Sequence, residues 1–254
     1  MEDFGKKMIE IVAVEKLPEI HEGDDFAALL ARAIRESGLE VAERDVFVIA
    51  QKVISKAEGR VVRLDSIEPS ELATEWARAH DKDARMVEVV LRESRRVVRM
   101  ERGVIICETR HGFICANAGV DASNTAEGTA VLLPLDPDLS ARRIRAALIR
   151  EFGVEVAVII SDTFGRPWRE GITNVAIGLA GIAPLADYRG QNDSHGRELR
   201  VTIIAVADEL ASAAELVMKK SAGLPVAVIR GFDYEARDAR IDELFRSVGR
   251  DLFR

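Results

Sequence analysis

The stretch that most constrains the fold is VEVAVIISDTFGRPWREGITN, at residues 154–174. It begins with a run at residues 154–160 that is apolar except for Glu155, and β-branched side chains predominate in it. Short runs of this kind are typical of a strand buried on both faces. We expect the strand to end at the polar residues 161–163, where a turn should follow.

The residues after this run have the chemistry of a metal and anion site. Asp162 and Thr163 stand at the expected strand end, where the backbone would hold their oxygens in place, and Mg²⁺ and Mn²⁺ prefer such ligands. Arg166 and Arg169 each supply a planar fork for phosphate or carboxylate. The alternative is a core strand followed by a polar turn, with Asp162 as a turn residue and Trp168 as a core anchor.

A second informative stretch is ANAGVDASN, at residues 116–124. Small residues surround Asp121 and Asn124, so a ligand could approach the backbone closely. Asp121 has the same setting as Asp162, at the end of an apolar segment and before a polar loop. Alone it would be a turn residue, but two such carboxylates on separate strands can flank one metal ion or a metal pair.

Two lysines follow another short expected strand, at residues 45–49, which is apolar after Asp45. Lys52 and Lys56 come directly after this expected strand, where they could meet phosphates, or they could be solvated side chains of a helical turn. The chain has a formal net charge of −7. Anionic substrates would therefore need individually placed cations, and no basic face indicates a nucleic-acid partner.

The chain of 254 residues is long enough for one large domain, or for two intimately packed subdomains. No apolar run approaches the length of a membrane span, and residues 1–11 carry charges without an apolar core. We therefore expect a cytoplasmic protein without a membrane partner. Cys107 and Cys115 lie in apolar surroundings and are interpreted as core residues rather than as a disulfide or a zinc site.

Elsewhere, strand and helix patterns alternate, and a hairpin is expected at residues 104–115. This mixture predicts an α/β or α+β architecture with mixed sheets. Helices are expected at residues 26–37, 140–150, 208–218 and 241–254, strands at 201–206 and 225–229, and a polar loop, either a substrate lid or a solvated excursion, at 187–200. The usual nucleotide-binding motifs are absent, so residue chemistry alone indicates a metal and anion site, with phosphate as the anion.

Several stretches together are similar to one known family. They are LPEI at 17–20, QKVISKAEGR at 51–60, ANAGVDASN at 116–124, SDTFGRPWREG at 161–171 and KSAGLPVAVIRG at 220–231. Their order and near full-length coverage resemble the coenzyme F420-0:L-glutamate ligase (γ-F420-glutamyl ligase) family. Related actinobacterial proteins carry an additional C-terminal flavin-reductase-like domain. This sequence ends without it, so we expect that activity to be missing.

The resemblance implies a single catalytic domain with the family's own α+β fold, in which helices flank mixed, largely antiparallel sheets. It also implies a homodimer. The implied activity is GTP-dependent ligation of L-glutamate to F420-0, then of a further γ-linked glutamate, through an acyl phosphate. The implied cations are Mg²⁺ or Mn²⁺, with K⁺ as a further candidate.

The resemblance also implies roles for individual residues. Asp121, Asp162 and Thr163 would hold metal, and Arg166 and Arg169 are candidates for clamping a substrate phosphate or carboxylate. The nucleotide would contact Leu17, Pro18, Glu19, Ile20, Gln51, Lys52, Lys56, Asn124, Lys219, Lys220, Ser221 and Gly223.

One departure concerns Lys219 and Lys220, which stand where many members have glycine and then a polar metal-contacting residue. A charged ammonium cannot ligate a metal, so we expect Lys220 to bind phosphate instead.

Three other functions remain open from the sequence. The first is another nucleotide-dependent carboxylate–amine ligase on the same scaffold. The second is a metal-dependent phosphohydrolase that uses the paired carboxylates without an amine acceptor. The third is a regulatory module that binds the nucleotide without turnover.

Overall fold

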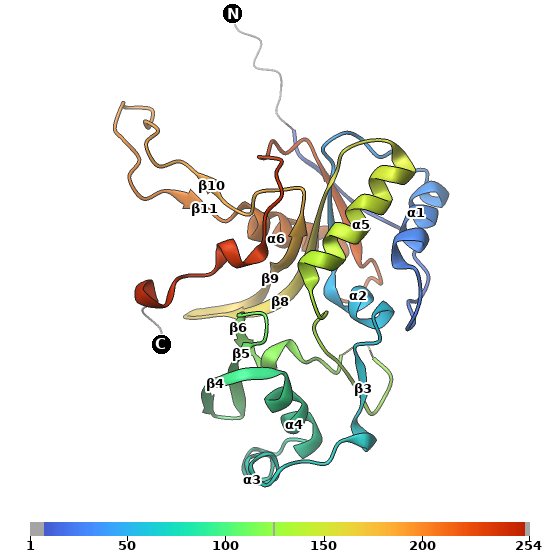
Figure 1. Ribbon diagram of the computed structural model, residues 1–254, viewed down its shortest axis with the longest axis vertical. Coiled ribbons are helices and arrows are strands. Elements are labelled where there is room, and N and C mark those ends of the chain that lie inside the picture. Colours follow the sequence, from blue (N-terminus) through green and yellow to red (C-terminus); the bar gives the residue numbers. More distant parts are fainter. Residues whose placement is uncertain (1–7, 124, 252–254) are drawn as a thin grey trace, which may run out of the picture.

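The computed structural model describes residues 8–123 and 125–251, and its centre is a five-stranded sheet (Figure 1). The strand order is β1-β12-β2-β8-β9. The strands are β1 (Glu10–Ala13), β12 (Val226–Arg230), β2 (Val46–Ala50), β8 (Ala157–Arg166) and β9 (Arg169–Ala180). Strands β2 and β8 run parallel, whereas the other neighbours are antiparallel. The polar segments that follow β2 and the apolar half of β8 therefore emerge at the same edge of the sheet.

Helices cover both faces of this sheet. Helix α5 (Pro137–Phe152) packs on β8 and β9 and contacts α1 (Phe26–Ser37), and α6 (Val206–Met218) packs across the sheet from β1 to β9 (Figure 1). Residues 46–49 of β2 and 157–160 of β8 are fully buried, as expected for strands covered on both sides. The predicted buried strand at residues 154–160 is thus confirmed, apart from its first residues.

The edge strand β9 is held by a carboxylate from each of these helices. Asp138 of α5 accepts a hydrogen bond from the Leu179 amide at 2.9 Å, and Asp208 of α6 accepts one from the Ala176 amide, also at 2.9 Å. Between them, Gly178 lies so close to α5 that a Cβ atom would come within 2.5 Å of the Pro137 backbone. Glycine is needed here for close packing rather than for a special backbone angle.

The middle of the chain forms a second hydrophobic cluster below the central sheet in Figure 1. The cluster includes Val87 and Val90 of α4, Ala73 and Ala77 of α3, and Cys107 of β5. The elements of this part are β3 (Val61–Arg63), α3 (Glu71–His80), α4 (Ala84–Glu93), β4 (Ser94–Glu101), β5 (Val104–Thr109), β6 (Ile114–Ala116) and β7 (Thr129–Val131). Helix α2 (Gln51–Ala57) connects β2 to this part.

The predicted fold class is confirmed, because the structure combines helices with mixed, mostly antiparallel sheets. Cys107 and Cys115 are buried free thiols, as expected for core residues. Within the described residues, no helix has both the length and the apolar character needed to cross a membrane.

The prediction that the central strand ends at residues 161–163 is wrong. Strand β8 continues to Arg166, because Asp162, Thr163 and the residues after them pair with β9 in a long hairpin. A register shift between Ile160 and Ser161 marks the change from the apolar half to the polar half. The polar side chains therefore stand on a regular ladder rather than in a turn.

Other boundaries also differ from the sequence interpretation. Helix α5 begins at Pro137, not at Ser140, because the Asp136 side chain caps it by accepting from the Leu139 amide at 2.9 Å. Of residues 201–206, only Ile203–Ile204 form a strand (β11), paired with Ala186–Asp187 (β10). The loop at 187–200 forms the extended arm beyond β10 and β11 in Figure 1.

The expected helix at residues 241–254 is absent from its described part. Short 3₁₀ turns at Ile241–Leu244 and Val248–Arg250 are found instead. Tertiary contacts override the helical spacing: the Ile241 amide donates to Asp138 at 3.2 Å, and the Phe245 ring packs edge-on against Phe113 at 5.2 Å.

Candidate active site

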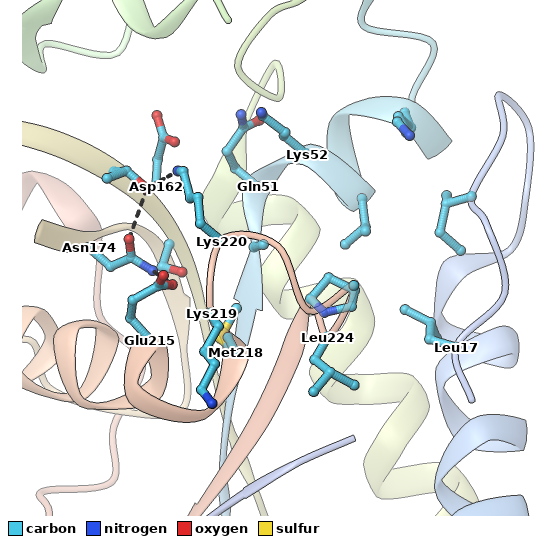
Figure 2. A pocket seen from close by; sticks show the side chains of 18 of the residues that line it. Leu17, Gln51, Lys52, Asp162, Asn174, Glu215, Met218, Lys219, Lys220 and Leu224 are labelled. Carbon is cyan, nitrogen blue, oxygen red and sulfur yellow. Dashed lines mark hydrogen bonds between the residues drawn. The ribbon is translucent and has the colours of Figure 1, made fainter. Parts of the chain in front are cut away.

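A cavity of about 450 Å³ opens where β2 and the apolar half of β8 end (Figure 2). Ligands of α/β sheets commonly bind beyond the carboxyl ends of parallel strands, and β2 and β8 are such a pair. The remaining walls come from the loop before α1 and from the turn between α6 and β12. Asn174 of β9 and Glu215 of α6 complete the lining, so the cavity is built by segments that are far apart in sequence.

The structure brings most of the predicted nucleotide-binding residues to this cavity. Those that line it are Leu17, Pro18, Glu19, Ile20, Gln51, Lys52, Lys56, Lys219, Lys220, Ser221 and Gly223, and the predicted metal ligands Asp162 and Thr163 line it as well. Asn124 lies outside the described residues. The roles of the lining residues remain predictions, but together these residues give the cavity several ammonium groups and a carboxylate.

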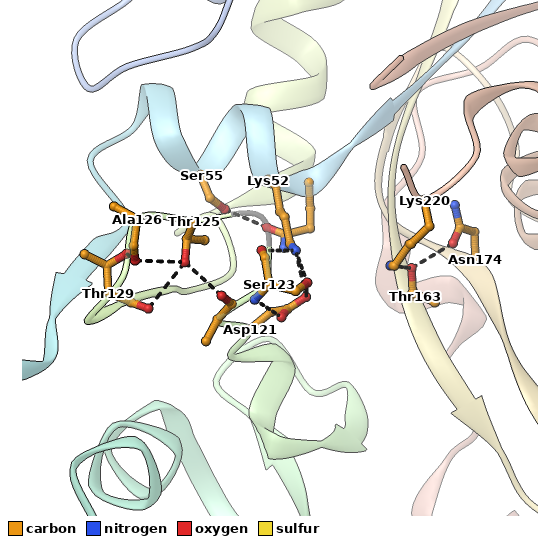
Figure 3. A network of polar contacts seen from close by, with 12 residues as sticks. Lys52, Ser55, Asp121, Ser123, Thr125, Ala126, Thr129, Thr163, Asn174 and Lys220 are labelled. Atoms are coloured by element: carbon orange, nitrogen blue, oxygen red, sulfur yellow. Dashed lines mark hydrogen bonds and ion pairs between the residues drawn. The ribbon is translucent and has the colours of Figure 1, made fainter. Parts of the chain in front are cut away.

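Asp121 reaches the same region through Lys52 (Figure 3). The Lys52 Nζ lies 2.8 Å from the Asp121 Oδ2, 2.7 Å from the Ser123 carbonyl oxygen and 2.8 Å from the Ser123 Oγ. Ser123 also donates to the carboxylate through its amide at 2.7 Å and its hydroxyl at 3.0 Å. Burial alone would raise the pKa of Asp121, but Lys52 and Ser123 outweigh it and hold the pKa below its usual value.

The pKa of Asp162 is shifted in the opposite direction to that of Asp121. Burial is the main reason that its pKa is raised to about 6, and repulsion from the Asp121 carboxylate adds to the shift. A hydrogen bond from the Thr163 amide and the charge of Lys220 act against it. Asp162 lines the cavity, whereas Asp121 is connected to it through Lys52, so their joint binding of one cation remains a prediction.

Thr163 stands between two polar partners. The Lys220 ammonium donates to the Thr163 Oγ1 at 2.8 Å, and this hydroxyl donates to the Asn174 Oδ1 at 2.9 Å (Figure 3). The Asn174 Nδ2 in turn donates to the Glu215 Oε2 at 3.0 Å. Asn174 and Glu215 also line the cavity, so they belong to the site although neither was predicted.

The predicted metal ligands fit a hard divalent cation. Asp121, Asp162 and Thr163 offer only oxygen, the donor that Mg²⁺ and Mn²⁺ prefer. Positive charge already lies against two of them, Lys52 on Asp121 and Lys220 on Thr163. In the described part of the chain, no group of three or more His, Cys, Asp or Glu side chains is gathered as a metal centre. A bound ion would therefore take further ligands from phosphates or water, which is common for Mg²⁺.

Arg166 and Arg169 are not brought to the cavity. They stand at the end of the β8–β9 hairpin, and the Arg166 guanidinium donates to the Glu170 carbonyl oxygen of its own hairpin at 2.6 Å. Trp168, between them, is 82% exposed and is therefore not a core anchor.

The position of Glu215 in the sequence contains a signal from which its role could have been predicted. Asp208, Ser212 and Glu215 recur at helical spacing, so they share one face of α6. Such a polar stripe is normally assigned to solvent. Here it faces β9: Asp208 accepts from the Ala176 amide, Ser212 donates to the Asn174 carbonyl oxygen at 2.7 Å, and Glu215 accepts from the Asn174 side chain.

Comparison with known proteins identifies the family of this chain. The model of the F420-0:gamma-glutamyl ligase family matches residues 15–231, which include the lysines, both aspartates and the α6–β12 turn. The chain is similar to proteins named coenzyme F420:L-glutamate ligase. It is 48% identical to that of Methanopyrus kandleri, which covers 97% of each chain. The Methanothermobacter thermautotrophicus protein is 45% identical over 97% of this chain and 99% of its own, and that of Archaeoglobus fulgidus is 42% identical over 97% and 96%. This chain belongs to the F420-0:gamma-glutamyl ligase family.

Proposed function

We propose that this protein ligates L-glutamate to coenzyme F420-0 and then adds a further γ-linked glutamate, with GTP as the energy source and Mg²⁺ or Mn²⁺ as the divalent cation. The observation that carries the proposal is the match of nearly the whole chain to relatives named for this reaction. The cavity supports it, because it places a carboxylate and several lysines around a space that suits a polyphosphate.

The chemistry explains why such a site needs both charges. A carboxylate does not condense with an amine at neutral pH. Attack of an F420-0 carboxylate oxygen on the γ-phosphorus of GTP would form an acyl phosphate and break the bond to GDP. The glutamate amine would then attack the acyl carbon, lose a proton and expel phosphate.

The residues of this chain would bind and orient the anions in this sequence. Lys56, Lys219 and Lys220 line the cavity, and their ammonium groups would lower the repulsion between GTP and the acceptor carboxylate. Asp121, Asp162 and Thr163 would hold the divalent ion. When bound, that ion would supply positive charge that stabilises the negative charge developing during transfer.

A homodimer belongs to the same proposal. Trp168 and Ile172 at the end of the β8–β9 hairpin are 82% and 62% exposed, and large apolar side chains in such positions commonly lie in protein interfaces. Light scattering after size exclusion tests the dimer, and a Trp168→Ser, Ile172→Ser variant should shift the population towards the monomer.

The deciding experiment is incubation with F420-0, GTP, L-glutamate and Mn²⁺, followed by mass spectrometry for a glutamyl adduct and by measurement of GDP. The proposal requires the adduct, and GDP release that depends on both F420-0 and glutamate. Phosphate release without glutamate would instead indicate the phosphohydrolase. An adduct formed only with a different acid would indicate another ligase, and GTP binding without turnover a regulatory module. Parallel reactions with ATP and with K⁺ test the nucleotide and the monovalent ion.

A further inference from the structure

Three side chains form a directional hydrogen-bond relay behind Thr163. The Thr163 hydroxyl donates to the Asn174 Oδ1 at 2.9 Å, and the Asn174 Nδ2 donates to the Glu215 Oε2 at 3.0 Å. Thr163 and Asn174 are direct cross-strand partners of β8 and β9, and Asn174 is only 5% exposed. The relay thus runs along the cavity wall, from β8 across β9 to α6, because all three residues line the cavity.

The chemistry of the relay determines which way it points. An ionised carboxylate only accepts hydrogen bonds, so the Asn174 atom beside Glu215 must be the NH₂ group. The amide oxygen then faces Thr163, whose single O–H group is used to reach it. What the Thr163 Oγ1 presents to the cavity is therefore its lone pairs. The donor found there, the Lys220 ammonium at 2.8 Å, agrees with this polarity.

The backbone around the relay is also anchored. Ser212 of α6 donates to the Asn174 carbonyl oxygen at 2.7 Å, and Asp208 accepts from the Ala176 amide at 2.9 Å. Helix α6 thus fixes both the main chain and the side chain of Asn174, and Asn174 has little freedom to turn its amide over.

We infer that Asn174 and Glu215 are positioning residues, which hold the Thr163 Oγ1 in a fixed orientation as a ligand of a divalent cation. This cation takes the place of the Lys220 ammonium when nucleotide and metal bind. The inference rests on the proposed function for the presence of that cation. Partners of this kind orient ligand atoms and strengthen binding, and their loss commonly weakens metal affinity by about 10–100-fold.

The test is Mn²⁺ binding in the presence of GDP, followed through the free Mn²⁺ signal in electron paramagnetic resonance. Asn174→Ala should weaken Mn²⁺ binding by about 10-fold or more in the wild-type background. In a Thr163→Val background it should cause no further loss, because the oxygen that it positions is already gone. A purely structural role for Asn174 would give the same loss in both backgrounds, and that result would overturn the inference.

Glu215 requires a separate comparison, since its charge alone could attract Mn²⁺. Glu215→Gln retains an oxygen that can accept from Asn174, so it should bind Mn²⁺ nearly as the wild type does, whereas Glu215→Ala should bind it less tightly. Equal loss in both variants would assign a charge effect and overturn the positioning role. Thr173→Val is the matched control: it removes a 2.9 Å contact between the same strand and the Ser212 hydroxyl, and it should leave Mn²⁺ affinity unchanged.

These measurements need no turnover. If wild-type protein with GDP binds no Mn²⁺, the inference is wrong, whatever the ligase assay shows. If Mn²⁺ binds and the double-variant comparison behaves as expected but no glutamyl adduct forms, the relay stands and the proposed substrates are wrong.

Discussion

The Lys52 ammonium lies 2.8 Å from the Asp121 carboxylate. This ion pair joins one segment beside the central hydrophobic cluster to another beside the second cluster. Lys52 belongs to α2, where Ile54 packs in the central cluster, and Asp121 follows Val120 of the second cluster. The pair therefore connects the two parts of the molecule at the edge of the cavity.

Lys52→Met should weaken this connection. It leaves the Asp121 carboxylate without its ammonium partner, so the pKa of Asp121 should rise. We expect the free energy of unfolding to fall by about 1 kcal/mol, a modest value because the carboxylate is 37% exposed. Urea unfolding measures the change. The control is Lys56→Met on the same helix, whose 3.7 Å pair with the exposed Glu19 should contribute less. Equal effects of both substitutions would contradict the structural role given to Lys52.

Substitution of Arg166 and Arg169 should affect the binding of GTP differently from the binding of the other substrates. Since neither lines the cavity, Arg166→Ala and Arg169→Ala should leave the KM for GTP unchanged. If these side chains clamp a substrate carboxylate or phosphate, the KM for F420-0 or glutamate should rise. Steady-state kinetics with each substrate varied in turn provides the measurement. An unchanged KM for every substrate would refute the clamping role.

Glu88, which lies in α4 beside the second hydrophobic cluster, should make the free energy of unfolding depend on pH. Its carboxylate accepts from the Ser70 amide at 3.0 Å and from Arg92 at 2.7 Å. Hydrogen bonds from Ser70, and then the interaction with Arg92, lower its pKa to about 2. A lowered pKa stabilises the fold above the unfolded value of 4.5, and this contribution is lost as pH falls towards 2.

Glu88→Gln should therefore cost about 1–3 kcal/mol at neutral pH, and the difference from wild type should shrink between pH 4.5 and 2. Unfolding curves across this range test it. A difference that stays constant with pH would show that the carboxylate charge is not responsible.

Gly178→Ala should disturb the contact between α5 and β9. The added Cβ would meet the Pro137 backbone at 2.5 Å, so the helix must move and weaken the Asp138–Leu179 hydrogen bond. Overpacking of this kind costs about 1–3 kcal/mol. Gly165→Ala is the control, because nothing lies within 4 Å of its Cβ position; its effect should stay within about 0.5 kcal/mol. Comparable melting temperatures for the two variants would be inconsistent with the packing described.

The sequence predicted correctly those helices and strands whose start, end and burial depend on residues within or next to the element itself. Helix α1 has the predicted bounds, because Asp25 caps its start and Gly38 ends it in the left-handed conformation. The apolar run of β8 was likewise clear. The sequence did not reveal that β8 continues past Asp162, since that depends on pairing with β9. It also did not reveal that residues 241–251 avoid a helix, since that depends on Asp138 and Phe113.

The site was only partly predictable for the same reason. Residues in motifs, such as Lys52 and Asp162, could be identified by their chemistry and by resemblance. Glu215 could not, because its importance comes from a contact with Asn174 across the sheet. Conversely, the chemistry of Arg166 suggested a place in the cavity, but the length of the hairpin carries it away.

The carboxylates that hold β9 have a consequence for assembly. With the Leu179 and Ala176 amides already bonded to Asp138 and Asp208, another chain cannot dock there by strand addition, because the donors that it would need are taken. Two copies of this protein therefore could not join their central sheets along this part of β9 without first displacing Asp138 and Asp208 from these amides.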